Sequence, residues 1–570
     1  MSSNPWKFKD LKFPKPDLRS FQDLNADAIE RINNAADGDT VLEVIFEHSE
    51  LARRANDLLE VSLIRYSMDT TDEKYSEERR WVYEHKPLFE RATVEFNEAV
   101  YNSPFKDYIQ KKLGPMYFTK MDVAKQTFCE ENILLLQREA ELEDEYQALM
   151  ATCQVEIDGE PRSFLALQRL FGHDDREVRK AAFKAFSNFL KENQEKLESI
   201  WDELIKTRTQ MGKNLGYDNY LPVAYLRRGR LDYSPEDVAN FRKQVVEEIV
   251  PLCNKLFEAQ RKRLGLDKLM AYDEAIAFLD GNAEPLFDEE GMKDEVFNVI
   301  SDMSPETEEF VDYMLDHELM DLDRRPGKAA REYSTMIASR KAPFLFSHFD
   351  GSAKSVKILL GEIGHAFATY RSSRKQPVDA YYTSTSDIME IHVMSMTQFS
   401  NRYAERLFGK DADKYRFFNL QDLMTFLPFG VAVDEFQHIC YENPDLTPKE
   451  RNLEWRKLEE KYMPWRNYEE DDEFMNGGGF WNHKHHIYIY PLYYIEYPLA
   501  TINAMEMHRK YAEHPELAWQ DYLRLVDMGG SKRYLETLTE SGLTPLFQDG
   551  AVAKAISYVK DELEKFIENE

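Results

Sequence analysis

The sequence predicts a mainly α-helical fold with one small β-sheet. Much of the stretch from residue 20 to residue 215 is charged, poor in glycine and proline, and apolar at helical spacing. Further along the chain, three segments carry the same helix-start pattern, and one short stretch has the composition of strands. These three observations predict packed helices before and after a short sheet.

The N-terminal helices are predicted from the spacing of their apolar residues. One run at this spacing is Leu51, Ala55, Leu58, Leu59 and Leu63. Side chains that recur every three or four residues share one helix face, so such a run predicts a helix packed by that face. Short polar stretches at residues 69–72 and 156–161 interrupt the pattern. We assign residues 1–200 to an N-terminal helical lobe and residues 201–570 to a second lobe.

Three later helices are predicted by their first residues. The sequences are Ser234-Pro-Glu-Asp237, Ser304-Pro-Glu-Thr-Glu308 and Thr447-Pro-Lys-Glu450. Each has a capping hydroxyl, a proline at the first helical position and an acid shortly after it. The first helix is expected to run toward Gly265, with a kink at Pro251 because proline removes one backbone hydrogen bond.

A small sheet is predicted between residues 332 and 349. Glu332–Ile337 and Ala342–Phe349 are rich in β-branched and aromatic residues, and the turn Asp350-Gly351 follows them. A helix with a metal-binding pattern comes next in the sequence. The expected order is therefore sheet first and then the motif helix.

Composition limits the classes of partner. The chain has 73 Lys+Arg against 104 Asp+Glu, a net charge of −31, which disfavours nucleic acid and anionic membranes as partners. No apolar run approaches the length of a membrane-spanning helix, and the first residues lack the pattern of a secretory signal. The four cysteines are scattered without paired spacing. We therefore expect a cytoplasmic protein in a reducing compartment.

The most informative stretch is Val356–Thr369, which contains Gly361-Glu362-Ile-Gly-His365. In a His-Glu-x-x-His motif, two histidines on one helix face bind zinc and the glutamate activates a water. Here the first histidine is replaced by Gly361, while Glu362 and His365 are present. Glu390 follows 25 residues after His365, a spacing typical of a third zinc ligand from a separate helix.

Three further segments extend this pattern. They are Lys341–Gly351 before the motif helix, Phe426–His438 after it, and the stretch from His486 to Tyr497, which carries a histidine and several tyrosines. With the motif helix and the Glu390 segment, they resemble the oligoendopeptidase F branch of the thimet oligopeptidase family of zinc metallopeptidases. The similarity covers about residues 200 to 570 with specific motifs and the N-terminal lobe more loosely.

The resemblance implies a two-lobed helical ellipsoid with a deep central channel and residues 201–570 as the catalytic lobe. It implies a hydrolase that cuts short peptides and uses one zinc ion. His365 and Glu390 would be zinc ligands, and Glu362 would be the general base. His486, Tyr490 and Tyr497 match positions that hydrogen-bond the scissile carbonyl as it becomes an oxyanion.

The first departure from the family pattern is Gly361. Two protein ligands are too few for an ordinary tetrahedral zinc site, so we expect zinc affinity to fall by orders of magnitude. Glycine is expected to leave a gap of about the size of the missing imidazole ring. His348, on the preceding strand, is a conceivable replacement ligand, whereas His392 would point away from Glu390 on the same helix.

The second departure lies ahead of Tyr333. The family resemblance leads one to expect consecutive glycines here, which let a peptide backbone lie close to the sheet edge, but this chain has Arg331 and Glu332. We expect Arg331, Glu332 and Tyr333 to contact substrate. The alternative is that the Arg331 and Glu332 side chains point to solvent.

Two functional hypotheses remain open at the level of sequence. The first is a zinc-dependent oligoendopeptidase with a weakened or reconfigured metal site, and the second is a metal-free pseudopeptidase that binds a peptide or small metabolite. Non-peptidase chemistry with Glu362 and the tyrosines is a third and weaker alternative. The sequence does not distinguish a natural Gly361 from an engineered one.

Overall fold

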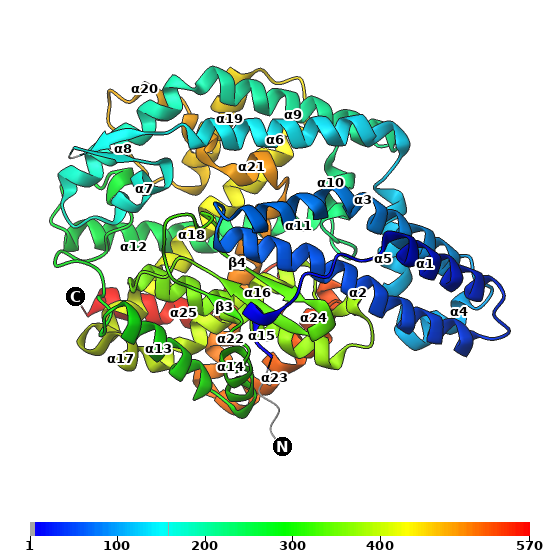
Figure 1. Cartoon of the computed structure of the whole chain (residues 1–570). Helices are drawn as coiled ribbons and strands as arrows, with labels where there is room; N and C mark the ends of the chain where they lie inside the picture. Colours follow the sequence, from blue (N-terminus) through cyan, green and yellow to red (C-terminus); the bar gives the residue numbers. More distant parts are fainter. Residues whose placement is uncertain (1–5, 158, 570) are drawn as a thin grey trace. The chain divides into compact units, whose positions relative to one another are not determined.

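The computed structural model describes residues 6–157 and 159–569, and it is 72% helical with only small sheets. The mainly α prediction is therefore confirmed. The chain folds into two compact units. Figure 1 labels the helices of both. Of the described residues, unit 1 contains 6–122, 284–412 and 510–543, and unit 2 contains 123–157, 159–283, 413–509 and 544–569. These segments alternate along the chain, so the units are a different division from the predicted lobes. The lobe boundary at residue 200 stays a prediction.

The helices of unit 1 are α1 (Leu18–Asn33), α2 (Gly38–Met68), α3 (Glu73–Tyr101), α4 (Lys106–Leu113), α5 (Met116–Gln126), α13 (Glu289–Ser301), α14 (Pro305–Asp316), α15 (Ala353–Lys375), α16 (Ser386–Ser400), α17 (Ala404–Phe408), α23 (Pro515–Met528) and α24 (Tyr534–Glu540). The polar break at residues 69–72 falls between α2 and α3, as its composition predicts. The apolar run on α2 is helical, and Ala55 and Leu58 from it are buried.

The helices of unit 2 are α6 (Ile133–Ala151), α7 (Phe164–Arg169), α8 (Arg176–Glu192), α9 (Gln194–Asn214), α10 (Leu221–Arg227), α11 (Pro235–Gln244), α12 (Val250–Arg263), α18 (Ala412–Glu442), α19 (Pro448–Tyr462), α20 (Glu473–Asn476), α21 (His485–Ile489), α22 (Glu496–Glu513) and α25 (Ala551–Glu568). At the ends of their ranges, α5, α18 and α22 cross the boundaries between the units. No helix in the described part of the chain is both long enough and apolar enough to span a membrane.

The three predicted helix starts are confirmed. Helices α11, α14 and α19 each begin with proline at the first position, and each has a reciprocal capping box. The prediction at Pro251 is refined, because a π-helical turn at Val245–Ile249 precedes α12 and puts the proline in its first turn. Residues 235–263 are helical without a break, so the π-helical turn accommodates a proline that lacks the N–H of a helical hydrogen bond. Helix α12 ends before Gly265, which has a φ of +64°.

The predicted sheet is present in unit 1 beside the motif helix. Strands β3 (Met320–Asp321), β4 (Tyr333–Ile337) and β5 (Ala342–Phe346) form a sheet in the order β3-β5-β4, with β4 antiparallel to β5. Every residue of β5 is buried, whereas β4 is an edge strand. In unit 2, the polar break at residues 156–161 falls within a hairpin of β1 (Val155–Ile157) and β2 (Glu160–Arg162).

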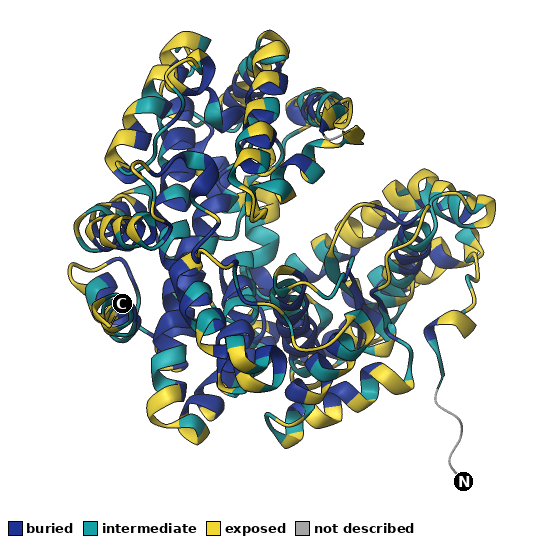
Figure 2. Cartoon of the chain, turned by 90° about the vertical axis from the view of Figure 1, so that its left-hand side faces the viewer, coloured by how far each residue is buried: buried dark blue, intermediate teal, exposed yellow. Residues whose placement is uncertain are grey.

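Helix α15 crosses α16 at very short range. A Cβ atom added to Gly364 of α15 would lie 2.4 Å from the backbone oxygen of His392 in α16. Only glycine permits this approach, because any side chain would overlap the neighbouring backbone. The helices of each unit are buried along the faces that pack together and exposed on the others (Figure 2). Helix α15 also contacts β4, β5, α13, α14 and α23, so it lies at the centre of unit 1.

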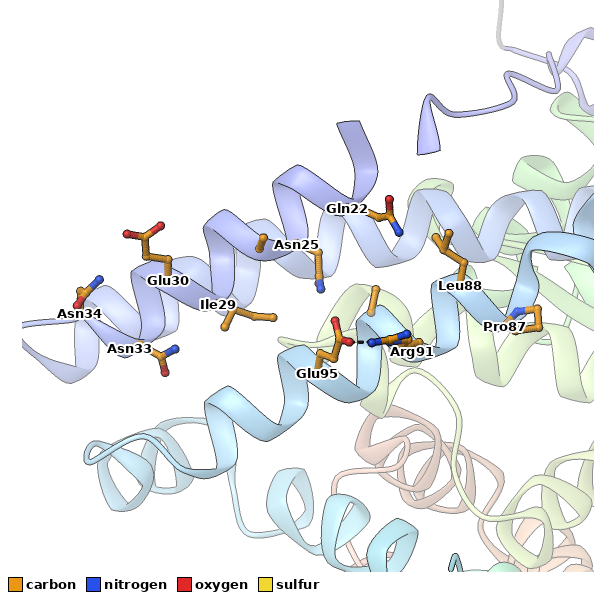
Figure 3. Close-up of a pocket in the computed structure, with 12 residues that line it drawn as sticks. Gln22, Asn25, Ile29, Glu30, Asn33, Asn34, Pro87, Leu88, Arg91 and Glu95 are labelled. Carbon is orange, nitrogen blue, oxygen red and sulfur yellow. Dashed lines mark hydrogen bonds and ion pairs between the residues drawn. The ribbon is translucent and has the colours of Figure 1, made fainter. Parts of the chain in front are cut away.

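A groove of about 800 Å³ lies between α1 and α3 of unit 1 (Figure 3). Its lining residues are Gln22, Asn25, Ala26, Ile29, Glu30, Asn33, Asn34, Pro87, Leu88, Arg91, Ala92 and Glu95. Oδ1 of Asn25 accepts a 2.8 Å hydrogen bond from Nε2 of the buried His48 of α2, and burial lowers the pKa of His48 to about 4. Arg91 is paired with Glu95. These polar groups are thus satisfied by one another, which indicates a structural role.

The α15–α16 crossing gives a prediction for stability. Gly364→Ala should lower the free energy of unfolding of unit 1 by about 1–3 kcal/mol or more, because the new methyl group overlaps backbone that has little room to move. Gly172→Ala is the matched control, since its added Cβ has no atom within 4 Å. Urea denaturation followed by circular dichroism would measure both variants. An unchanged midpoint for Gly364→Ala would show that the crossing is looser than described.

Candidate active site

Unit 1 brings the acidic and histidine residues of the motif together. Glu362 and His365 lie one turn apart on α15, with 3.8 Å between Oε2 of Glu362 and Nδ1 of His365. Glu390 is buried on α16, which packs against α15. The side chains of Glu362 and His365 are 19% and 23% exposed, so both are partly accessible. The structure thus places the three predicted residues on two adjacent helices.

The charges around His365 favour its protonated form. Burial lowers the pKa of His365, but the Glu362 carboxylate, the charge of Glu390 and the backbone of Met389 outweigh that effect, and the net pKa is raised. Among the described residues, Nε2 of His365 and Oε2 of Glu362 have no hydrogen-bond partner although both atoms are buried. Buried polar atoms are normally paired, so this pair marks a position where a further polar group would be stabilised.

The structure corrects the expectation of a gap beside Gly361. A Cβ atom added at this position would lie 2.8 Å from Cγ1 of Val393 on α16. Gly361 is fully buried, and the space next to it is occupied by the valine methyl group. A side chain at residue 361 therefore requires Val393 to move or to be replaced by a smaller residue.

The residues present do not fit a closed zinc site. Among residues 6–157 and 159–569, no three His, Cys, Asp or Glu side chains are grouped so that they could hold a metal ion. Nε2 of His348 donates a 2.7 Å hydrogen bond to the carbonyl of Ala329, so this nitrogen carries a proton and is not available to a metal. His392 is buried against the ring of Tyr522, at 5.7 Å between ring centroids. Neither histidine takes the place of the ligand missing at Gly361.

The residues ahead of the edge strand are held by contacts with β5, and their role in substrate binding stays a prediction. Arg331 and Glu332 precede β4 and are exposed. The Glu332 carboxylate accepts hydrogen bonds from the Ser347 hydroxyl at 3.1 Å and from the His348 N–H at 3.3 Å, so it is held toward the end of β5. Tyr333 begins β4, and its ring stacks on Phe346 with 5.0 Å between centroids. Glu332 thus combines solvent exposure with a contact to the neighbouring strand.

In unit 2, the predicted histidine and tyrosines form an aromatic cluster. The ring of His486 lies 5.8 Å from Tyr490, 4.9 Å from Tyr494 and 5.9 Å from both Tyr493 and Tyr497. Nδ1 of His486 is buried without a hydrogen-bond partner among the described residues, and Tyr490 is 48% exposed. Burial and the positive charges of nearby residues lower the pKa of His486, which keeps its imidazole neutral.

Buried ion pairs hold this cluster in place. Glu496, at the start of α22, pairs with Arg228 and Arg230, each at 3.0 Å. Arg230 also donates to the carbonyl of Leu492, whose N–H donates to Gln437 at 2.9 Å. Leu492 has a φ of +57°, so the turn that presents the tyrosines needs such support. Sequence reasoning missed these residues because their partners are far away in the chain.

Comparison with known protein families shows which family the chain belongs to. The sequence pattern of Peptidase family M3 matches residues 170–555, and that of the Peptidase M3 N-terminal domain matches residues 8–128. The chain belongs to peptidase family M3. Members of this family are generally zinc metallopeptidases. The first match covers both the motif helix and the His486 cluster.

Two solved structures and one relative compared by sequence agree with this assignment. One described as PZ peptidase A with an inhibitor is 37% identical, with 98% of this chain and 99% of that chain covered and a TM-score of 0.90. A putative oligoendopeptidase F from Bacillus anthracis is 35% identical, with 99% of each chain covered and a TM-score of 0.86. An oligoendopeptidase F homolog from Borreliella burgdorferi is 21% identical over 72% of this chain and 69% of its own length. The similarity to these two solved structures extends over 98% and 99% of the chain.

The loop before β4 gives a prediction for peptide binding. If Arg331 and Glu332 restrict the approach of a peptide to β4, then replacing both by glycine should increase the affinity for short extended peptides by severalfold, because a backbone could lie closer to the strand. Fluorescence anisotropy with a labelled pentapeptide would measure it.

The control for this experiment is Glu332→Gln, which keeps the size of the side chain and removes its charge. An affinity that is unchanged in the double-glycine variant would show that both side chains leave the peptide path open. An equal increase in affinity in Glu332→Gln and in the double-glycine variant would indicate an effect of charge in place of a steric one.

Proposed function

We propose that this M3 peptidase acts on short peptides and that hydrolysis is limited by an incomplete zinc site. The observation that carries the proposal is that three residues of the motif are brought together while the first ligand position is empty of a side chain. Glu362, His365 and Glu390 lie on adjacent helices, whereas residue 361 is glycine and Val393 stands beside it. In this proposal the chain can bind a peptide even when it holds no zinc ion.

The proposed roles follow the resemblance residue by residue. His365 and Glu390 would be the metal ligands that remain, and Glu362 would be the general base. His486, Tyr490 and Tyr497 would donate hydrogen bonds to the peptide carbonyl. The mixture of neutral His486 and partly exposed Tyr490 supports a donor role, because a neutral imidazole and a phenol can each donate one hydrogen bond. Edge strand β4 would offer its free side to an extended peptide.

A second candidate function is peptide binding without hydrolysis. It is favoured by one observation, the Val393 methyl group that fills the space beside Gly361. With that space filled by protein, this part of the chain is packed without a metal ion. Such a chain would retain the peptide-binding surfaces of the family and lack its chemistry, and we propose a cytoplasmic location for either function.

Zinc content is the first test. The purified chain should hold well under one zinc per molecule after mild chelation, because two protein ligands cannot close a tetrahedral site. Inductively coupled plasma mass spectrometry of chelated and untreated protein would measure this. Stoichiometric zinc that survives chelation would contradict the proposal and would redirect attention to a ligand other than His348 and His392.

Restoration of the ligand is the second test. Gly361→His combined with Val393→Ala should bind zinc tightly, because the new imidazole lies one turn from His365 and the smaller residue makes room for its Cβ. Cleavage of a quenched fluorescent peptide should appear with the metal. Gly361→His alone should bind zinc less well than the double variant.

The matched control is Gly361→Ala with Val393→Ala, which changes packing and adds no ligand. Zinc binding without peptide cleavage in the histidine variant would favour the metal-free binder as the function of the chain. If the histidine variant binds no zinc at all, Glu390 is not a metal ligand.

A further inference from the structure

Lys484 lies at the His486 cluster of unit 2, where its charge helps to lower the pKa of His486, and no contact with substrate has been assigned to it above. It directly precedes α21, two residues before His486. Its ammonium nitrogen lies 4.3 Å from the centre of the Tyr494 ring and 5.8 Å from that of Phe429. A cation over aromatic faces is attracted by their negative charge, so the rings fix the position of this ammonium group.

The ammonium group of Lys484 lacks an acidic partner. In the described ranges 6–157 and 159–569, no carboxylate forms an ion pair or hydrogen bond with it. The neighbouring cations differ in this respect, because Arg228 is paired with Glu496 and Arg466 is paired with Glu274. The chain has 104 acidic residues, and burying a lysine without an acidic partner is unfavourable, so the position of Lys484 calls for an explanation.

Burial disfavours the charged form of the Lys484 side chain. Desolvation lowers the pKa of Lys484 to about 7, and no charged side chain opposes that shift. An anion placed beside the ammonium would reverse the effect, because an opposite charge favours the charged form. The site is therefore electrostatically suited to receive a negative group from outside the chain.

The position of Lys484 relative to His486 connects it to peptide binding. Both side chains contact the same ring, since His486 lies 4.9 Å from Tyr494, edge to face. His486 is one of the residues proposed to bind the peptide carbonyl. A negative group held by Lys484 would accordingly belong to a residue close to that carbonyl in the substrate.

We propose that Lys484 binds a carboxylate of the peptide substrate and makes this chain selective for peptides that carry one near the bond held at His486. The inference rests on the proposed function and specifies its substrate class. The carboxylate has two sources in a short peptide, the C-terminus and an Asp or Glu side chain. Both would form a charge-assisted hydrogen bond with the ammonium group.

The experiment compares matched peptides at equilibrium, so that no cleavage is needed. One pentapeptide is prepared with a free C-terminus and with a C-terminal amide, and a second amidated pair differs only by Glu or Gln inside the sequence. Competition against a labelled peptide gives the four affinities for the unmodified chain and for Lys484→Met. Lys457→Met is the control, because Lys457 is exposed and already paired with Glu454.

The unmodified chain should prefer at least one carboxylate peptide over its neutral partner by about tenfold, the value expected for a partly buried charge-assisted hydrogen bond. Lys484→Met should abolish that preference, and Lys457→Met should retain it. A preference in the first pair identifies the C-terminus as the source, and a preference in the second identifies an acidic side chain. Equal affinities within both pairs, or a preference that survives in Lys484→Met, would overturn the inference.

A second measurement uses the unmodified chain alone and does not depend on the folding of a variant. Acetic anhydride should acylate Lys484 readily at neutral pH, and the preferred carboxylate peptide should slow that acylation severalfold in peptide mapping by mass spectrometry. Equal acylation with either peptide would count against the inference. Cleavage by the zinc-restored variant tests the proposed function separately, so carboxylate selectivity can fail while peptidase activity stands, and the reverse.

Discussion

The close crossing of α15 and α16 is the constraint on which the motif region depends. At Gly364 the two backbones approach so closely that a single methyl group would overlap the carbonyl of His392. This approach sets the separation of Glu362 and His365 on one helix from Glu390 on the other. It also explains why residue 361, one turn earlier on the same face, has so little space. Packing and chemistry are therefore coupled in this part of unit 1.

Electrostatics differs between the two groups of proposed functional residues. In unit 1, carboxylates raise the pKa of His365, whereas in unit 2 burial and nearby cations lower the pKa of His486. The surroundings thus favour the protonated form of His365 and the neutral form of His486. The first arrangement suits a group that interacts with acids or a metal, and the second suits a neutral hydrogen-bond donor.

Local features of the structure could be predicted from the sequence, because they depend on neighbouring residues. The capping boxes of α11, α14 and α19, the strands β4 and β5 and the helical placement of Glu362 and His365 are of this kind. The interleaving of the two units could not be predicted, since it depends on contacts between distant segments. The same holds for Val393 beside Gly361 and for the ion pairs of Glu496. Lys484 stands next to His486 in the sequence, but its lack of an acidic partner is a property of the folded chain alone.

The valine beside Gly361 has a consequence for the evolution of such a site. Valine in a helix strongly prefers one side-chain rotamer, so its methyl group cannot easily turn away. A histidine at residue 361 would need two substitutions in a chain with Gly361 and Val393. If histidine came first, it would overlap Val393, and if Val393 were replaced first by a smaller residue, a small cavity would form. Either order begins with a less stable protein. Packing of this kind therefore makes it difficult for a metal ligand to arise at residue 361 by single substitutions.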